Sequence, residues 1–339
     1  MAGLTTTLEL LLARMDLSEA QAGDLLRALT DENAAPAMVA ALLVALRAKG
    51  ETVAEVRGFA TAMRGLARRF DLPPGLPAVD IVGTGGDGSG SLNISTGAAL
   101  LAAACGLPVV KHGNRSVSSR SGSADVLEAL GVALPADAAA ARALLDATNF
   151  TFLFAPNFHP AMKAVAPVRR ALGVRTVFNI LGPLTNPASP PFSMIGAFDL
   201  AMAKLLADAL AGMPIQRCFV VHGEPGWDEA TPVGPFVVYE VRPGSVRRHK
   251  RDPAHYGIPR CSADDLAGGD AAGNARAIED VLLGRDDGPH RDALVLGAGL
   301  VLDLTGRARG LRRGIELARR TLATGGGGEL LNRLRAHRS

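Results

Sequence analysis

Asp71-Leu72-Pro73-Pro74-Gly75-Leu76-Pro77, followed at once by Ala78-Val79-Asp80-Ile81-Val82-Gly83-Thr84-Gly85-Gly86-Asp87-Gly88, divides the chain into two parts. Three prolines and one glycine within residues 71–77 predict a linker or hinge. The apolar run 79–82 predicts a buried strand, and the glycines after it allow backbone N–H groups to face a ligand. Such a turn binds phosphate or pyrophosphate, and a plain tight turn is the alternative.

The residues before this linker are predicted to form helices only. Ser18 with Gln21 and Thr52 with Glu55 are capping-box pairs, which mark the starts of helices. Apolar residues recur at spacings of three and four through residues 38–70. We therefore expect about four short helices in a small bundle.

The residues after the linker are predicted to alternate between strands and helices. Apolar runs predict strands at 79–82, 108–111, 218–222 and 237–241, a hairpin or meander over 239–250, and helices at 96–105, 123–131 and 293–304. Strands that alternate with helices predict an α/β domain. The glycine run 325–328 predicts a turn before a last short helix.

Composition limits the function classes. The 339 residues are 48% hydrophobic and only 4% aromatic, with a net charge of +3, which fits an anionic substrate and is too small an excess to argue for nucleic acid. Cys105, Cys218 and Cys261 are widely spaced and form no CxxC, so neither a disulfide framework nor a zinc site is indicated. No stretch fits a signal peptide or a membrane span. We expect a cytoplasmic protein without nucleic-acid or membrane partners.

Small polar residues continue just beyond the glycine turn. Ser91 and the run Asn93-Ile94-Ser95-Thr96 stand where a helix is predicted to start. Capping of that helix by Ser95 or Thr96 is one interpretation. The other adds contacts to a phosphate at the positive end of the helix, and the two are compatible.

A second polar segment follows the next predicted strand. Lys111-His112-Gly113-Asn114-Arg115 is followed by five serines and Arg120 within residues 116–123. A solvated loop is the alternative to a phosphate site. Because ligands of α/β sheets bind at the carboxyl ends of strands, two such loops on neighbouring strands favour a shared site.

Acidic and basic residues further along complete the candidate site. Asp228-Glu229 is an adjacent carboxylate pair after a predicted strand, and Mg²⁺ prefers one or two carboxylates together with substrate phosphates. His159, Lys163, Arg169 and Arg175 form a third segment, in which an arginine could bind a carboxylate in bidentate fashion. Spacing alone does not select one of them.

Five ordered motifs resemble the anthranilate phosphoribosyltransferase family. They are GTGGD at 83–87, NIST at 93–96, KHGNRSVSSRSGSAD at 111–125, HPAMKAVAPVRRALGVRT at 159–176 and FNILGPLTNP at 178–187. The acidic pair of GWDEATPVGP at 226–235 stands where the family has its metal pair, and Gly268-Gly269 with Asn274-Ala275 is similar to a later segment. The resemblance runs from about residue 5 to about residue 320.

The resemblance implies a helical domain at 1–72 that forms a homodimer, and an α/β domain at 73–339 with a central mixed sheet, the fold shared with pyrimidine nucleoside phosphorylases. The segment 160–190 is a candidate to pack on the helical domain. The implied reaction joins anthranilate to phosphoribosyl pyrophosphate in tryptophan biosynthesis, with Mg²⁺ as cofactor.

The resemblance also assigns residues by position. It implies catalytic roles for Lys111, Asp228 and Glu229. It implies metal binding by Ser95, Asp228 and Glu229. The phosphoribosyl pyrophosphate contacts are Gly83, Gly86, Asp87, Ser91, Asn93, Ile94, Ser95, Thr96, Lys111, Ser119 and Ser123. The anthranilate contacts are Gly83, His112, Asn114, His159 and Arg169, with Arg169 as the partner of the carboxylate.

Two departures from the family pattern keep alternatives open. Asp292-Ala293-Leu294-Val295 replaces the usual Leu-Asn-Ala-Ala, and Glu224-Pro225-Gly226-Trp227 before the acidic pair is unusual. A paralogue for another aromatic amine, a nucleoside phosphorylase of the same fold, and a nucleic-acid-binding relative without activity are the alternatives. The retained KHGNR segment and the small net charge disfavour the last of these.

Overall fold

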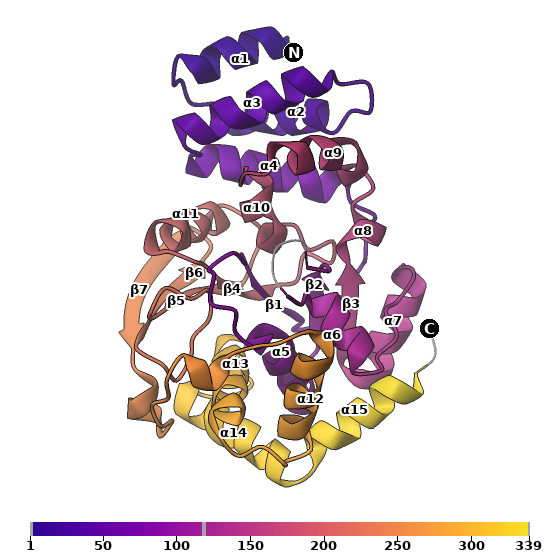
Figure 1. Ribbon diagram of the computed structural model, residues 1–339, viewed down its shortest axis with the longest axis vertical. Helices are drawn as coiled ribbons and strands as arrows, with labels where there is room; N and C mark the ends of the chain where they lie inside the picture. Colours follow the sequence, from indigo (N-terminus) through magenta and orange to yellow (C-terminus); the bar gives the residue numbers. More distant parts are fainter. Residues whose placement is uncertain (1–2, 117–119, 338–339) are drawn as a thin grey trace.

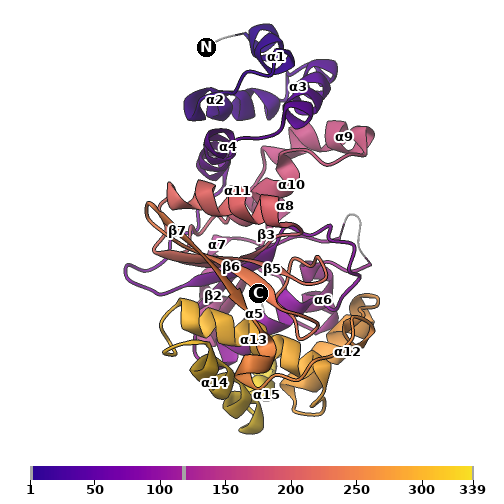
Figure 2. The ribbon, with the colours of Figure 1, turned by 90° about the vertical axis from the view of Figure 1, so that its left-hand side faces the viewer.

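A computed structural model describes residues 3–116 and 120–337, and its first four helices form the bundle predicted before the linker (Figure 1). Their bounds are α1 (Leu4–Leu12), α2 (Glu19–Leu29), α3 (Pro36–Lys49) and α4 (Val53–Leu66). The bundle lies at one end of the molecule, above the sheet and its helices (Figure 2). In the described part of the chain, no helix combines the length and apolar character needed to cross a bilayer.

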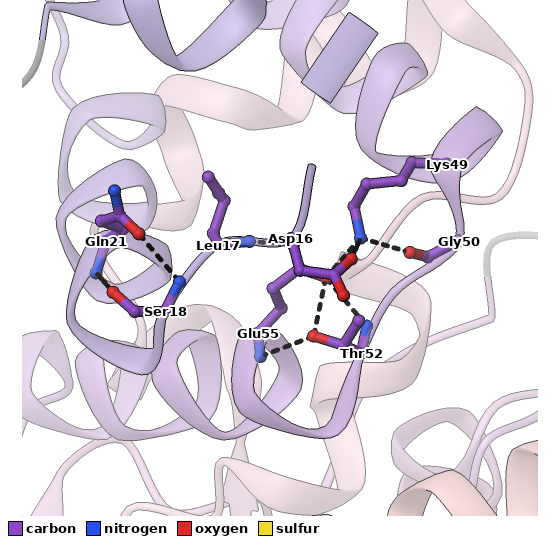
Figure 3. Close-up of polar contacts among 8 residues, drawn as sticks. All are labelled: Asp16, Leu17, Ser18, Gln21, Lys49, Gly50, Thr52 and Glu55. Atoms are coloured by element: carbon purple, nitrogen blue, oxygen red, sulfur yellow. Dashed lines mark hydrogen bonds and ion pairs between the residues drawn. The ribbon is translucent and has the colours of Figure 1, made fainter. Parts of the chain in front are cut away.

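Both predicted capping boxes are confirmed. The Ser18 hydroxyl accepts from the Gln21 N–H at the start of α2, and the Thr52 hydroxyl accepts from the Glu55 N–H at the start of α4. Figure 3 shows that Glu55 does more than cap. Its buried carboxylate also accepts from the Leu17 N–H at 2.9 Å and pairs with Lys49 at 2.9 Å. The cap therefore ties together the α1–α2 loop, α3 and α4.

The α/β part is built on one mixed sheet of seven strands in the order β3-β2-β1-β4-β5-β6-β7. The first five are parallel, and β6 and β7 are antiparallel, which confirms the predicted hairpin. The bounds are β1 (Val79–Gly83), β2 (Val109–Gly113), β3 (Phe150–Phe154), β4 (Phe192–Gly196), β5 (Arg217–Gly223), β6 (Phe236–Arg242) and β7 (Ser245–Arg251).

Helices cover both faces of this sheet. Side chains alternate along β5, so that Phe219 and Val221 join the core formed with α5 and α13, whereas Cys218 and Val220 join the core shared by α11 and the bundle. The bounds are α5 (Ile94–Ala104), α6 (Ser123–Ala129), α7 (Ala138–Thr148), α8 (Ala155–Phe158), α9 (Met162–Leu172), α10 (Phe178–Leu181), α11 (Leu200–Ala211), α12 (Ala271–Leu282), α13 (Pro289–Leu304), α14 (Leu311–Ala323) and α15 (Gly326–Ala336). Short 3₁₀ helices are η1 (Gly182–Leu184), η2 (Pro253–Tyr256) and η3 (Asp264–Leu266).

The prediction of a turn over residues 325–328 is wrong for three of its four glycines. Gly325 has φ 81° and precedes α15, but Gly326 to Gly328 form the first turn of that helix. A side chain at Gly327 would overlap the Leu282 carbonyl oxygen at the end of α12. The glycines therefore let two helices approach closely, and this tertiary contact overrides their poor helix propensity.

Candidate active site

The site lies where the strand order reverses. From β1 the chain proceeds to β2 on one side and later returns to β4 on the other, and β1 and β4 are hydrogen-bonded neighbours that end together at Gly83 and Gly196. Loops diverge at such a point and leave a crevice at the carboxyl ends of the strands. The glycine turn 83–88 begins in this crevice, and its Thr84 N–H donates to the Gly196 carbonyl at 2.9 Å.

Four adjacent parallel strands, β2, β1, β4 and β5, end in glycine, and the acidic pair lies across the last three. A methyl group at Gly83 would collide with the Asp228 carboxylate. At Gly196 it would meet the Asp228 carbonyl oxygen, and at Gly223 the Glu229 carbonyl oxygen. The absence of side chains at these strand ends therefore makes room for the acidic segment. The roles of Gly196 and Gly223 were missed from the sequence, where the only signal is a glycine at the end of an apolar run.

Backbone hydrogen bonds hold the acidic pair in place. The Gly85 N–H donates to Asp228 Oδ2 at 2.6 Å, and the Ser95 N–H donates to Glu229 Oε1 at 3.0 Å. The Asp228 N–H donates to Asp87 Oδ2 at 3.2 Å. Ser95, Asp228 and Glu229, which were predicted together as metal ligands, are thus brought together with Asp87.

Lys111 enters the same site from β2. Its side chain is 2% exposed, and its ammonium donates to the Ile81 carbonyl and to Ser95 Oγ, the latter at 3.4 Å. Burial lowers the pKa of Lys111, while Asp80, Glu229 and Asp228 oppose that shift. A buried ammonium surrounded by acceptors is placed to receive an anionic group.

The site carries an excess of negative charge that a divalent cation would balance. Burial raises the pKa of Asp228 well above its usual range, and the neighbouring Asp87 carboxylate raises it further. Burial and Asp228 do the same for Glu229, although Lys111 partly offsets the shift. A cavity of about 10 Å³, about the space of one water, is lined by Ser95, Asp228 and Glu229 among others. The carboxylate and hydroxyl donors fit Mg²⁺.

The start of α5 corrects one interpretation. Asn93, not Ser95 or Thr96, is the N-cap, and its side chain makes no capping bond. Instead, Asn93 Oδ1 accepts from Asn274 Nδ2 at 2.8 Å and from the Ser121 hydroxyl at 3.1 Å. The Thr96 hydroxyl is buried without a hydrogen-bond partner in the described structure. The predicted contact Ile94 directs its side chain into the apolar core.

Asn274, which was noted only as part of a resemblance, orders this corner of the site. Its Oδ1 also accepts from the Gly269 N–H at 2.7 Å. Gly268 lies against the Ser91 carbonyl, and Ser91 forms a bridge with Ala267. The Ser91 hydroxyl lies 3.2 Å from that of Ser89. A segment about 180 residues downstream therefore supports the predicted phosphate-binding loop.

The segment after β2 is described only in part. Asn114 follows the strand, and its carbonyl accepts from Ser123 Oγ at 3.3 Å at the start of α6. Arg115 pairs with Asp125 at 3.2 Å and with Glu128, so its charge is held against α6. The predicted contact Ser119 lies outside the described residues.

Two buried histidines lie side by side near this strand end. The rings of His112 and His159 are 5.1 Å apart, and burial lowers their pKa values to about 3 and about 4. His112 Nδ1 lies 3.3 Å from the Gly182 carbonyl oxygen, while its Nε2 has no described partner. The His159 ring lies beside the Thr185 backbone, which favours its protonated form, without a hydrogen bond of normal geometry. Both rings are therefore neutral near pH 7.

Two arginines of the third segment take different positions. The Arg169 guanidinium lies 5.2 Å from the centre of the Phe178 ring, and burial lowers its pKa. Arg175 donates to the Gly86 carbonyl of the glycine turn and lies 4.5 Å from the Phe198 ring centre. No hydrogen bond or ion pair within residues 3–116 and 120–337 joins Arg169 or Asn114 to the acidic pair. The described contacts therefore do not link those two predicted residues directly to the acidic pair.

Comparison with known proteins adds independent information. Residues 5–67 match the "Glycosyl transferase family, helical bundle domain" and residues 75–327 match the "Glycosyl transferase family, a/b domain". The anthranilate phosphoribosyltransferase of Desulforudis audaxviator is 48% identical over 96% of this chain and 94% of its own length. That of Rubrobacter xylanophilus is 45% identical over 91% and 90%.

Solved structures agree with these sequence relatives. The anthranilate phosphoribosyltransferase of Thermus thermophilus aligns with a TM-score of 0.91 at 43% identity, covering 98% of both chains. The Saccharomyces cerevisiae enzyme in complex with PRPP and Mg aligns with a TM-score of 0.90 at 28% identity, over 98% of this chain and 97% of that one.

Proposed function

This chain belongs to the anthranilate phosphoribosyltransferase family, and on that premise we propose that its strand-end site transfers the 5-phosphoribosyl group of PRPP to the amine of anthranilate. The products are N-(5-phosphoribosyl)anthranilate and pyrophosphate, in tryptophan biosynthesis. The observation that carries the proposal is the position of Asp228 and Glu229 across the glycine ends of β1, β4 and β5, beside the buried ammonium of Lys111.

The donor half of the site is built for a polyphosphate. Asp228 and Glu229, with Ser95, would hold Mg²⁺, which supplies charge neutralisation at the leaving pyrophosphate. Lys111 and the N–H groups of the glycine turn stabilise the same charge. The proposed PRPP contacts are Gly83, Gly86, Asp87, Ser91, Asn93, the backbone at Ile94, Ser95, Thr96, Lys111, Ser119 and Ser123.

The acceptor half needs no activated nucleophile, because the amine of anthranilate is already one. Gly83, His112, Asn114, His159 and Arg169 are the proposed contacts. Neutral histidines suit an aromatic ring, and Arg169 suits its carboxylate. Holding the amine in line with C1′ supplies much of the rate. We expect oxocarbenium character at C1′, inversion there, and no covalent intermediate.

The direct test is the loss of anthranilate fluorescence with PRPP and Mg²⁺. We expect consumption that stops when EDTA removes the metal and resumes when Mg²⁺ is restored. A chain that leaves anthranilate unchanged but releases bases from pyrimidine nucleosides with phosphate would instead be the phosphorylase. Consumption of another aromatic amine in preference to anthranilate would indicate the paralogue.

Replacing Arg169 by Ala should raise KM for anthranilate about 100-fold and leave KM for PRPP within about twofold. A bidentate charge-assisted contact to one substrate is lost, and such contacts contribute about 1.5–3 kcal/mol. Initial rates with each substrate varied separately measure both constants. Arg170→Ala, one position along the same helix, is the matched control. Equal shifts in the two constants would show that Arg169 does not bind the carboxylate.

Assembly and location are further parts of the proposal. We propose that residues 1–72 form the dimerisation domain of a homodimer and residues 73–339 the catalytic domain. Leu12, Met15 and Val44 of the bundle are 62%, 53% and 44% exposed, which an apolar interface would explain. Sedimentation equilibrium of the full chain tests this, since a monomer at micromolar concentration contradicts it. The three unpaired cysteines support a cytoplasmic location.

A further inference from the structure

Segment 178–188 supports three proposed anthranilate contacts at once. Phe178, at its start, lies under the Arg169 guanidinium. The Gly182 carbonyl faces His112 Nδ1, and the Thr185 backbone lies beside His159. The position of this segment relative to the sheet therefore bears on three of the five proposed anthranilate contacts.

One buried amide joins the segment to the sheet. Asn186 is 2% exposed, and its Nδ2 donates to Asp80 Oδ2 at 2.8 Å and to the Val110 carbonyl at 2.9 Å. Its Oδ1 accepts from the Ala188 N–H at 2.9 Å. The second carboxylate oxygen of Asp80 accepts from the His112 N–H at 3.2 Å. The two oxygens of one carboxylate thus hold both sides of the contact between His112 and the segment.

Burial raises the pKa of Asp80 to about 6, and cations on two sides partly offset this cost. Lys111 on β2 and Arg64 on α4 both interact electrostatically with Asp80. Arg64 Nε also donates to the Leu184 carbonyl at 2.7 Å, within the same segment. The segment is therefore clamped between an arginine of the helical bundle and an aspartate of the sheet. An apolar residue on β1 could pack there without desolvation cost but would offer neither acceptor.

We propose that Asp80 is a positioning residue for the acceptor half: its two carboxylate oxygens fix His112 and, through Asn186, segment 178–188, and so align Arg169, His112 and His159. This inference rests on the proposed function and deepens it. Asp80 is buried and is not among the proposed substrate contacts, and no role was assigned to Asp80, Asn186 or Arg64 from the sequence.

Two variants separate the positioning role of Asp80 from the electrostatic effect of its charge on Lys111. Asn186→Ala removes the link to the segment and leaves the Asp80 carboxylate in place. Asp80→Asn keeps the shape but supplies one acceptor and one donor, so either the His112 N–H or Asn186 Nδ2 must face a donor. Asp292→Asn is the matched control, because Asp292 is a buried carboxylate paired with Arg291 at 2.9 Å in α13.

Steady-state kinetics on the full chain, with each substrate varied, provide the readout. We expect Asn186→Ala to raise KM for anthranilate about tenfold and KM for PRPP less than twofold, since three side-chain hydrogen bonds are lost, two of which fix the segment to the sheet. Asp80→Asn should raise KM for anthranilate at least as much. It should also lower kcat, because it removes a negative charge that interacts with Lys111. The double variant should differ from Asp80→Asn by less than twofold, because both changes break the same link. Asp292→Asn should alter thermal stability and neither KM.

The outcomes distinguish the inference from the function on which it rests. The inference alone is overturned if the wild-type protein is active and Asn186→Ala folds but leaves KM for anthranilate unchanged. Equal shifts in the two KM values of that variant would overturn it as well. Should Asp80→Asn fail to fold, Asn186→Ala and Asn186→Ser still decide the question. Wild-type protein that leaves anthranilate unconsumed overturns the proposed function and this inference with it.

Discussion

Asp228→Asn combined with Glu229→Gln should lower kcat about 1,000-fold at millimolar Mg²⁺. The two carboxylates are the anionic ligands proposed for the metal, and the amides keep their shape and can still accept from the Gly85 and Ser95 N–H groups. Loss of metal stabilisation at the leaving group is a loss of several kcal/mol, and about 4 kcal/mol corresponds to three orders of magnitude in rate. Rates measured across a Mg²⁺ titration provide the test.

Although its kcat falls, this double variant should be at least as stable to heat as the wild type. The folded-state pKa values of Asp228 and Glu229 are raised to about 7 and about 8, so ionising these groups destabilises the fold; this cost grows as pH rises from the ordinary carboxylate range to the raised values and is constant above them. Neutral amides remove that cost, and we expect Tm near pH 8 to be unchanged or higher. Mg²⁺ with pyrophosphate should raise Tm of the wild type and not of the variant.

A matched control uses a second adjacent acidic pair. Asp286→Asn with Asp287→Asn changes two carboxylates near the surface, where Asp286 accepts from the Gly288 N–H. That variant should keep the wild-type rate and Mg²⁺ dependence. If the Asp228/Glu229 variant also keeps the wild-type rate at low Mg²⁺, the metal assignment is wrong.

Lys111→Met should lower kcat/KM for PRPP about 100- to 1,000-fold. Methionine fills the buried volume, but it removes the ammonium that interacts electrostatically with Asp80, Asp228 and Glu229. An ammonium that meets developing charge in a site of low polarity contributes about 3–4 kcal/mol to the transition state. Kinetics with PRPP as the varied substrate measure the effect.

The Lys111 result needs its own control and a second observation. Lys204→Met in α11 removes an exposed lysine that pairs with Asp208, and it should leave kcat/KM within about twofold. Lys111→Arg should not rescue activity, because a guanidinium is larger than the buried space that Lys111 fills. Full activity in Lys111→Met would remove Lys111 from the catalytic group.

Local patterns in the sequence determined much of the architecture. The capping boxes at Ser18 and Thr52, the linker at 71–77 and the apolar run 79–82 depend on near neighbours in the chain, so each could be predicted from the sequence alone. The same holds for three short motifs that could be recognised from adjacent residues: the glycine turn, the segment that begins at Lys111 and the pair Asp228-Glu229. Strands β3 and β4 were missed because short apolar runs do not distinguish strand from buried helix.

The sequence by itself determined which residue types this protein would bring to the proposed phosphate site and at which strand ends they would lie. Only the tertiary structure decided that Gly196 and Gly223 make room for the acidic pair, that Asn93 bonds to Asn274, and that Asp80 holds Asn186. Those contacts join residues far apart in the chain, and they follow from strand register and burial. Local propensity carries no information about either, because both are set by how the whole sheet and its covering helices pack.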